Sequence, residues 1–323
     1  MELSPFTAAR WLADKAIDPS KMQFRELGGG VSNRVILADS PGWRAVLKQP
    51  LGRLRVEQEW LSDRTRIFRE AAAMRWAKGK LRGGRVPELL IEDPDEFIIA
   101  MEAAPADAVM WKELLFAGVF DPEHARAVGW MLGSMIATSF ASSEARSIFE
   151  DRTVFRQLRI DPYYRFTAER HPKLAPFFHG LIERSAARAV SLVHGDWSPK
   201  NLLVSGQEVW VIDWEVVHFG DPSFDVGFLL NHLLLKSIAM PQYREPLAHL
   251  AETFVTALRT ELPPEGLWVE GAAFEHLPAL LLARVDGKSP AEYLTEEMRG
   301  NARHLAISLM NEGARPLKEL FEA

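Results

Sequence analysis

The hydrophobic pattern of the chain changes character near Ala106, and this change constrains the fold more than any other feature. Before it, short apolar runs bounded by turn residues predict strands over residues 24–27, 34–38, 43–48, 88–91 and 97–102. After it, apolar residues recur at the spacing of long helices, with one strand-like stretch at 201–217. The sequence therefore predicts an α+β protein with a β-rich lobe over 1–104 and a mainly helical lobe over 105–323.

Two helices are expected before that change, an opening one over 7–15 and an inserted one over 56–77. The strands at 34–38 and 43–48 are joined by Asp39-Ser40-Pro41-Gly42, a strong turn signal, so the first lobe should hold an antiparallel meander. A chain of 323 residues is also long enough to divide its core between two lobes.

Composition excludes several classes of function. The net charge is −6 with Lys and Arg scattered along the chain, so a nucleic-acid surface is not expected. The chain has no cysteine, which excludes disulfides and thiolate metal sites. The uncharged run 127–142 is too short for a membrane span and predicts a buried helix. The N-terminus lacks an apolar signal core, so a cytoplasmic protein without membrane contact is expected.

The segment 191–215 carries the strongest chemical signal. His194-Gly195-Asp196 ends an apolar run, and two further apolar stretches flank Gly206-Gln207, which predicts a hairpin. A hairpin centred on Gln207 places Asn201 opposite Asp213, with Cβ atoms roughly 5 Å apart. Such an amide and carboxylate can share Mg²⁺, and Asp196 on the preceding loop lies within reach as a base. This is the arrangement that phosphoryl transfer needs.

A second signal lies in the first lobe. Gly28-Gly29-Gly30-Val31-Ser32-Asn33 separates two predicted strands, where backbone N–H groups can approach phosphates. The turn at Ser40-Pro41 puts Lys48 opposite Asn33, next to this glycine loop. We therefore expect Gly28, Gly29, Gly30, Ser32, Asn33 and Lys48 to bind a nucleotide.

These motifs resemble the aminoglycoside phosphotransferase and choline kinase superfamily, which shares the protein-kinase-like two-lobed fold. The run from Asp213-Trp214-Glu215 through 220–231 is most similar to the methylthioribose kinase branch, although residues 197–201 depart from that branch's pattern. The resemblance implies that Asp196 is the catalytic base. It also implies metal ligands at Asn201, Asp213 and Glu215, and an anchor for the catalytic loop at Asp225.

For the first lobe, the resemblance implies that Lys48 holds the phosphates of ATP and pairs with a glutamate on the inserted helix. Glu70 matches the family position, with Glu57 and Glu59 as competitors. The strand at 97–102 would lead into an interlobe hinge, where the backbone of Met101 and Ala103 pairs with adenine. The cofactors implied are ATP and Mg²⁺.

The acceptor is expected to be a small molecule with a hydroxyl group. Asp225 follows Asp213 by only twelve residues, and the chain has no Ala-Pro-Glu triplet, so a protein kinase's activation segment has no room. Sugars, amino alcohols and aminoglycosides all remain open, as does the oligomeric state. Candidate acceptor contacts are Tyr163, Tyr164, Arg165, Trp214, His232, Arg284 and Asp286.

The sequence thus predicts an ATP- and Mg²⁺-dependent kinase that transfers the γ-phosphoryl group to a hydroxyl of a small acceptor. One alternative is a nucleotide-binding regulatory protein of the same fold without turnover. Another is an enzyme that transfers a nucleotidyl group instead.

Overall fold

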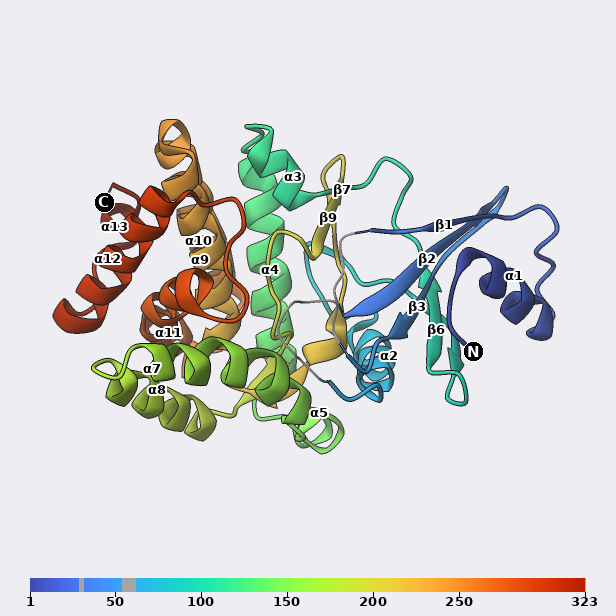
Figure 1. Ribbon diagram of the computed structural model, residues 1–323, viewed down its shortest axis with the longest axis horizontal. Helices are drawn as coiled ribbons and strands as arrows, with labels where there is room; N and C mark the ends of the chain where they lie inside the picture. The colour runs from blue at the N-terminus through green and yellow to red at the C-terminus, as the bar shows by residue number, and fades with distance from the viewer. Residues whose placement is uncertain (29–31, 54–61, 323) are drawn as a thin grey trace.

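A five-stranded antiparallel sheet forms the N-terminal part of the protein in the computed structural model, which describes residues 1–28, 32–53 and 62–322. Its strand order is β1-β2-β3-β6-β5. The bounds are β1 (Gln23–Glu26), β2 (Asn33–Ser40), β3 (Trp43–Pro50), β5 (Leu89–Asp93) and β6 (Ile98–Glu102). Figure 1 shows this sheet on the right and the helical part on the left. The predicted meander of β1 to β3 is confirmed.

Both faces of the sheet pack against other parts of the protein. Successive side chains of a strand point to opposite faces, so alternate residues of one strand belong to different clusters. Ile98 and Ala100 of β6 pack in one cluster with helix α1 (Pro5–Asp14), whereas Ile99 and Met101 pack in the main core with helix α2 (Arg66–Ala77). The sheet is therefore a layer between α1 and the remainder of the molecule.

Helix α2 begins later than the sequence pattern predicted. Residues 62–65 are not helical, and the backbone N–H of Thr65 donates to Asp63 Oδ1 at 2.8 Å, a local turn that competes with the helix. Residues 54–61, which include Glu57 and Glu59, lie outside the described residues.

The remaining chain is mainly helical, as predicted. Its helices are α3 (Trp111–Phe116), α4 (Pro122–Ser139), α5 (Ser143–Phe149), α6 (Thr153–Phe155), η1 (Arg156–Arg165), α7 (Phe166–Arg170), α8 (Ala175–Ala187), η2 (Trp214–Val216), α9 (Ser223–Ala239), η3 (Pro241–Tyr243), α10 (Arg244–Glu261), η4 (Pro264–Gly266), α11 (Trp268–Asp286), α12 (Glu296–Glu312) and α13 (Leu317–Glu322). Among the described residues, none of the helices combines the length and apolar character that crossing a bilayer needs.

Two small sheets lie at the junction between the parts. One has the order β4-β10-β9-β7 and the other pairs β11 with β8. Their bounds are β4 (Gly84–Arg85), β7 (Val109–Met110), β8 (Ser191–Val193), β9 (Leu202–Ser205), β10 (Glu208–Val211) and β11 (His218–Gly220). Because β4 comes from the first 104 residues and pairs with β10, the two parts share a sheet. The division at residue 104 stays a prediction.

Helices α4 and α10 pack closely because α4 carries small residues where they meet. A Cβ atom added at Gly133 would lie 2.7 Å from the backbone oxygen of Leu258, and one at Gly129 would lie 2.8 Å from Cβ of Ala257. Real Cβ atoms do not approach other atoms so closely, so both positions require glycine to keep the two helix axes at this separation.

We expect Gly133→Ala to destabilise the protein by about 1–3 kcal/mol, because the new methyl group forces α4 away from the backbone of α10. The matched control is Gly271→Ala in α11, where an added Cβ meets nothing within 4 Å. That substitution should leave stability unchanged or raise it by about 0.5–1 kcal/mol. Urea unfolding followed by circular dichroism measures both. Equal effects of the two substitutions would contradict the packing argument.

Candidate active site

The loop 194–196 is held at its start by one buried carboxylate. Asp225, in the first turn of α9, accepts hydrogen bonds from the backbone N–H groups of His194 at 2.6 Å and Gly195 at 2.8 Å. Gly195 has φ +79°, and a Cβ there would lie 2.8 Å from Val216 Cγ1. Glycine is therefore required at this position, and the loop conformation is set by the start of α9.

The predicted hairpin forms, but its register differs by one residue from the prediction. Leu202 pairs with Val211, so Asn201 lies opposite Ile212 and accepts its N–H at 3.0 Å. The reason is that the turn is two residues long, Gly206-Gln207, and its centre lies between them. Asp213 follows the last paired residue in a left-handed conformation, φ 67° and ψ 57°, which aspartate tolerates better than most residues.

Asp196 is buried, and both of its carboxylate oxygens are occupied. Oδ1 lies 3.0 Å from Arg159 Nη2, and Oδ2 lies 2.8 Å from Lys200 Nζ. The side-chain amide of Asn201 also donates to Oδ2 at 2.8 Å. Burial by itself raises the pKa of Asp196, but the Arg159 and Lys200 charges outweigh it and hold the pKa below its ordinary value. Asp196 is therefore a carboxylate at neutral pH.

Lys48 joins the sheet to the hairpin. Its ammonium group lies 2.7 Å from Glu70 Oε2 in α2 and 2.5 Å from Asp213 Oδ1. Lys48 pairs with Val35 rather than with Asn33, because the β2–β3 turn is centred between Pro41 and Gly42. Burial opposes the charge of Lys48, but the carboxylates of Asp213 and Glu70 outweigh it and raise its pKa.

Glu215 makes a second connection between the two parts. Its Oε2 accepts hydrogen bonds from Arg66 Nε of α2 at 2.9 Å and from Asn33 Nδ2 at 3.0 Å. Arg66 also donates through Nη2 to the carbonyl of Ser32 at 2.6 Å. The end of the glycine loop is thus tied to Glu215 through both Asn33 and Arg66.

Three carboxylates meet at this point, and they suit a hard divalent cation. Oxygen atoms of Glu70, Asp213 and Glu215 lie within 4.8 Å of one another. This set contains two of the three predicted metal ligands. The amide nitrogen of the third, Asn201, donates to the carbonyl of Asp196 at 2.9 Å, in addition to its bond with the carboxylate. Oxygen donors of this kind fit Mg²⁺.

Burial raises the pKa of the Glu70 carboxyl to about 7, although Lys48 opposes the shift. Lys48 is also the main reason that the pKa of Asp213 falls below its ordinary value despite burial. Asp213 is therefore the more strongly anionic of the two carboxylates that contact Lys48.

The other predicted nucleotide contacts are only partly described. Gly29 and Gly30 lie outside the described residues, and a Cβ at Gly28 would meet nothing within 4 Å. Met101 lies in β6, and Ala103 follows it. The backbone N–H of Ala103 donates to the carbonyl of Arg44 at 3.3 Å, so this donor is already used within the protein.

The structure separates the candidate acceptor contacts. Tyr164 bonds His276 at 2.7 Å, Trp214 packs on His194, Asp286 pairs with Arg303 and His171, and Arg165 pairs with Asp161. Tyr163, His232 and Arg284 instead belong to one group of contacts with Phe228, and Arg159 lies over the rings of Tyr163 and Phe228. Arg284 Nη1 lies 3.5 Å from the Tyr163 hydroxyl, and the rings of Tyr163 and His232 both contact Phe228.

Sequence reasoning missed Arg159 and Arg66, which pair with Asp196 and Glu215. Arg159 lies in η1, a ten-residue π-helix, a form that is uncommon and often found at functional sites. No motif marks either arginine, because each partner is distant in the sequence. Lys200 lies within the segment 191–215, and its ion pair with Asp196, four residues earlier, could have been predicted from this short spacing.

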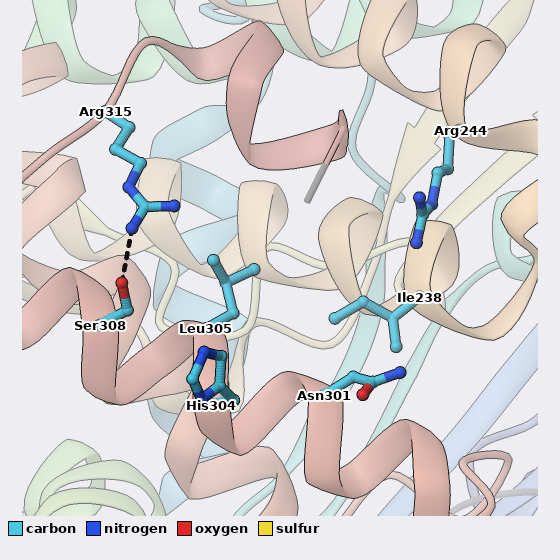
Figure 2. Close-up of a pocket in the computed structure, with 7 residues that line it drawn as sticks. All are labelled: Ile238, Arg244, Asn301, His304, Leu305, Ser308 and Arg315. Atoms are coloured by element: carbon cyan, nitrogen blue, oxygen red, sulfur yellow. Dashed lines mark hydrogen bonds between the residues drawn. The ribbon is translucent and has the colours of Figure 1, made fainter.

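A cavity of about 410 Å³ lies elsewhere, between α9, α10 and α12 (Figure 2). These helices stand on the side away from the five-stranded sheet (Figure 1). The lining residues are Ile238, Arg244, Asn301, His304, Leu305, Ser308 and Arg315. It contains none of the residues that the sequence singled out, so it is separate from the carboxylate site.

The curated relatives and the similar solved structures described below are all named as kinases of small molecules. The chain is 23% identical over 254 residues to a methylthioribose kinase of Escherichia coli O45:K1, covering 69% of this chain and 60% of that protein. It is 25% identical over 246 residues to methylthioribose kinase 2 of Oryza sativa subsp. japonica, covering 66% of this chain and 56% of that protein. The chain thus spans about 60% of the length of these relatives.

Similar folds occur in an amicoumacin kinase solved with AMP-PNP and Ca²⁺, with a TM-score of 0.60, 16% identity and 96% of both chains covered. A choline kinase from Cryptosporidium parvum gives 0.57 at 14% identity, covering 99% of this chain and all of that one. These likenesses confirm the protein-kinase-like fold. The profile of the phosphotransferase enzyme family matches residues 23–257, and the chain belongs to this family.

Proposed function

We propose that the protein is a kinase that uses ATP and Mg²⁺ to phosphorylate a hydroxyl group of a small molecule. One observation carries the proposal: Lys48 of the sheet and Asp213 of the hairpin meet at 2.5 Å, beside a loop that holds Asp196 ionised. Asp213 is close enough to Asp196 for its charge to act on the pKa of Asp196. Family membership and the methylthioribose kinase relatives support the same chemistry.

In this proposal, residues 1–104 form a nucleotide-binding lobe and residues 105–323 a lobe for catalysis and the acceptor. The similar amicoumacin kinase, solved with AMP-PNP and Ca²⁺, supports a nucleotide together with a divalent cation. Asp213, Glu215 and the amide oxygen of Asn201 would hold Mg²⁺, which would neutralise charge on the transferred phosphate.

Asp196 would orient the acceptor hydroxyl and receive its proton. Its low pKa makes it a weak base, which suits phosphoryl transfer because bond breaking to the leaving group precedes most of the proton transfer. Arg159 is buried and keeps the carboxylate in place, whereas the Lys200 side chain is 50% exposed. Lys200 can therefore turn from Asp196 to the incoming phosphate while Arg159 remains.

Lys48 would bind the nucleotide phosphates while staying paired with Glu70. This requires it to exchange Asp213 for phosphate oxygens, which frees Asp213 for the metal. Breaking the contact between Lys48 and Asp213 costs little net free energy in this proposal, because each group gains a new partner of opposite charge.

Following label from ATP tests the proposal. With γ-labelled ATP, an acceptor screen of sugars, amino alcohols and aminoglycosides should yield labelled product, and α-labelled ATP should not. Label from the α position in the product would identify nucleotidyl transfer. Binding of ATP with no labelled product from any acceptor would favour a regulatory nucleotide-binding protein.

We expect Lys48→Met to abolish transfer and to destabilise the protein by about 3–5 kcal/mol at pH 8, because Glu70 and Asp213 lose their buried counter-charge. The loss of folding stability in this variant should become smaller towards pH 5. Without Lys48, the folded-state pKa of Glu70 rises further above its unfolded value, so stability falls as pH rises between the two. Thermal unfolding across this pH range measures the effect.

Lys78→Met is the matched control, since Lys78 pairs with Glu88 at 2.6 Å but both side chains are exposed. Exposed pairs contribute little, so this variant should unfold like the parent. Equal behaviour of the two lysine variants would show that the ion pairs of Lys48 contribute no more to stability than an exposed pair.

Asp213→Ala should weaken nucleotide binding in the presence of Mg²⁺ and abolish transfer, because the site loses an anionic ligand whose pKa lies below its ordinary value. Calorimetric titration with ATP in Mg²⁺ and again in EDTA makes the comparison, and the EDTA value should change much less. Normal turnover by the variant would remove Asp213 from the metal site.

Asp196→Asn should bind Mg-ATP nearly as tightly as the parent, while single-turnover transfer falls on the order of 10²- to 10⁴-fold. The amide keeps the shape of the side chain but cannot accept the hydroxyl proton. Parent-like turnover would reject Asp196 as the base. Loss of ATP binding in a folded variant would instead assign Asp196 to the nucleotide site.

A further inference from the structure

Lys236 of α9 is a buried cation without an ion-pair partner in the part of the chain that the structure describes. Its side chain is 1% exposed, and its ammonium nitrogen lies 5.3 Å from the ring centre of Phe116 and 5.7 Å from that of Tyr293. Its one polar contact is with the carbonyl of His232, at 3.4 Å. Ring faces and one long hydrogen bond replace the carboxylate that a buried lysine normally has.

Arg284 of α11 is a second cation without an ion-pair partner among the described residues, and it is half-buried. Its Nη1 donates to the hydroxyl of Ser289 at 2.9 Å and lies 3.5 Å from the hydroxyl of Tyr163, whereas its buried Nε has no hydrogen-bond partner. Within residues 1–28, 32–53 and 62–322, no carboxylate forms an ion pair with it. We call Lys236 and Arg284 the unpaired cations.

The contrast with other buried cations shows that this arrangement is not general in the protein. Lys48 contacts Glu70 and Asp213, Arg66 contacts Glu215, and Arg159 contacts Asp196. Each of these three has a carboxylate within 3.0 Å. The unpaired cations have only hydroxyl groups, carbonyls and aromatic rings around them.

Arg284 is connected to the catalytic loop through Tyr163 and Arg159. Arg159, which holds Asp196, lies 5.7 Å from the ring centre of Tyr163, and the Tyr163 hydroxyl contacts Arg284. On the other side, Lys200 contacts Asp196. Lys112, whose backbone N–H bonds the carbonyl of Pro199 in the same loop, adds further positive charge nearby.

The electrostatics agree with an unbalanced positive charge. Burial, then Lys112 and Arg284, lower the pKa of Lys236 to about 7. Burial together with Lys236, Arg284, Lys200 and Lys112 lowers the pKa of His232 well below its ordinary value. The hydroxyl of Tyr293 is buried and has no hydrogen-bond partner among the described residues. Burial raises its pKa to about 12, so it remains a hydrogen-bond donor. The Lys236 ammonium, the Arg284 guanidinium and the Tyr293 hydroxyl can all donate hydrogen bonds, so together they favour an anionic ligand.

We propose that the acceptor carries a carboxylate or phosphate group besides its hydroxyl, and that Lys236 and Arg284 bind this anion while Asp196 receives the hydroxyl. This inference rests on the proposed kinase function and deepens it. In the reaction, the bond between the γ-phosphorus and the bridging β-oxygen breaks and one to the acceptor oxygen forms. The hydroxyl proton goes to Asp196, and ADP leaves. The same positive charges repel polyamine and quaternary ammonium acceptors.

Binding of matched compounds tests the inference separately from catalysis. Calorimetry compares D-glycerate with glycerol, gluconate with glucitol, and ribose 5-phosphate with ribose. We expect at least one anion to bind more tightly than its neutral counterpart, and Lys236→Met to weaken it on the order of 10- to 100-fold. At pH 8, binding should take up a proton, because an anion raises the pKa of Lys236; the measured heat then varies with the buffer. This dependence should vanish in the variant.

Lys80→Met is the matched control, because Lys80 also lies over an aromatic ring, 4.3 Å from the centre of Trp76, but in the first lobe. It should bind the anion like the parent. Lys236→Met should fold at least as stably as the parent, since it removes an uncompensated charge. If it does not fold, Arg284→Gln provides the second variant and should weaken anion binding similarly.

The outcomes separate the two proposals. Transfer of the γ-phosphoryl group to neutral or cationic acceptors but to none of the anions would overturn the inference and leave the kinase function intact. Anion binding that depends on Lys236, with no γ-label transferred to any compound, would support the anion site and reject the kinase function. Failure of all three anions to bind, or equal binding by Lys236→Met, would also overturn the inference.

Discussion

The contact of Lys48 with Glu70 and Asp213 is the interaction on which the rest of the site depends. It joins a strand, a helix and a hairpin that are far apart in the sequence, with 165 residues between the lysine and Asp213. Two acids and one base share a site from which water is largely excluded, so none of the three can be removed without exposing the others to an unbalanced charge. A strong contact of this kind fixes the spacing between the sheet and the hairpin.

Around that contact, the protein distributes charge unevenly. On the side of the proposed nucleotide site, each buried cation that the structure describes has a carboxylate partner. The resulting network of Lys48, Arg66 and Glu215 holds groups that would meet phosphates and metal in our proposal. On the side of η1, α9 and α11, Lys236 and Arg284 have no carboxylate partner among the described residues. The first arrangement is complete within the chain, whereas the second is completed by a ligand in our proposal.

Much of the fold was predictable because its signals are local. The turn at Pro41-Gly42, the hairpin at Gly206-Gln207 and the end of the β-rich region follow from residue types within a few positions. Register was less predictable. Lys48 pairs with Val35 because the centre of the β2–β3 turn lies one residue later than predicted, and Asn201 lies opposite Ile212 because the centre of the hairpin lies half a residue earlier. Either shift changes every partner along the strands. The predicted start of α2 was wrong, because the hydrogen bond from the Thr65 backbone N–H to the Asp63 carboxylate competes with the helix.

By itself, the sequence predicted which residues would bear the chemistry: Asp196, Asn201 and Asp213 stand in one short segment whose spacing follows from a loop and a hairpin. Only the tertiary structure decided what surrounds them. Arg66 contacts Glu215, which lies 149 positions later in the sequence. Arg159 contacts Asp196 from a π-helix that no sequence motif predicts. The absence of a carboxylate beside Lys236 among the described residues is likewise a property of packing. Periodicity and turns act between neighbours, whereas the balance of buried charge depends on which distant side chains the folded chain brings together.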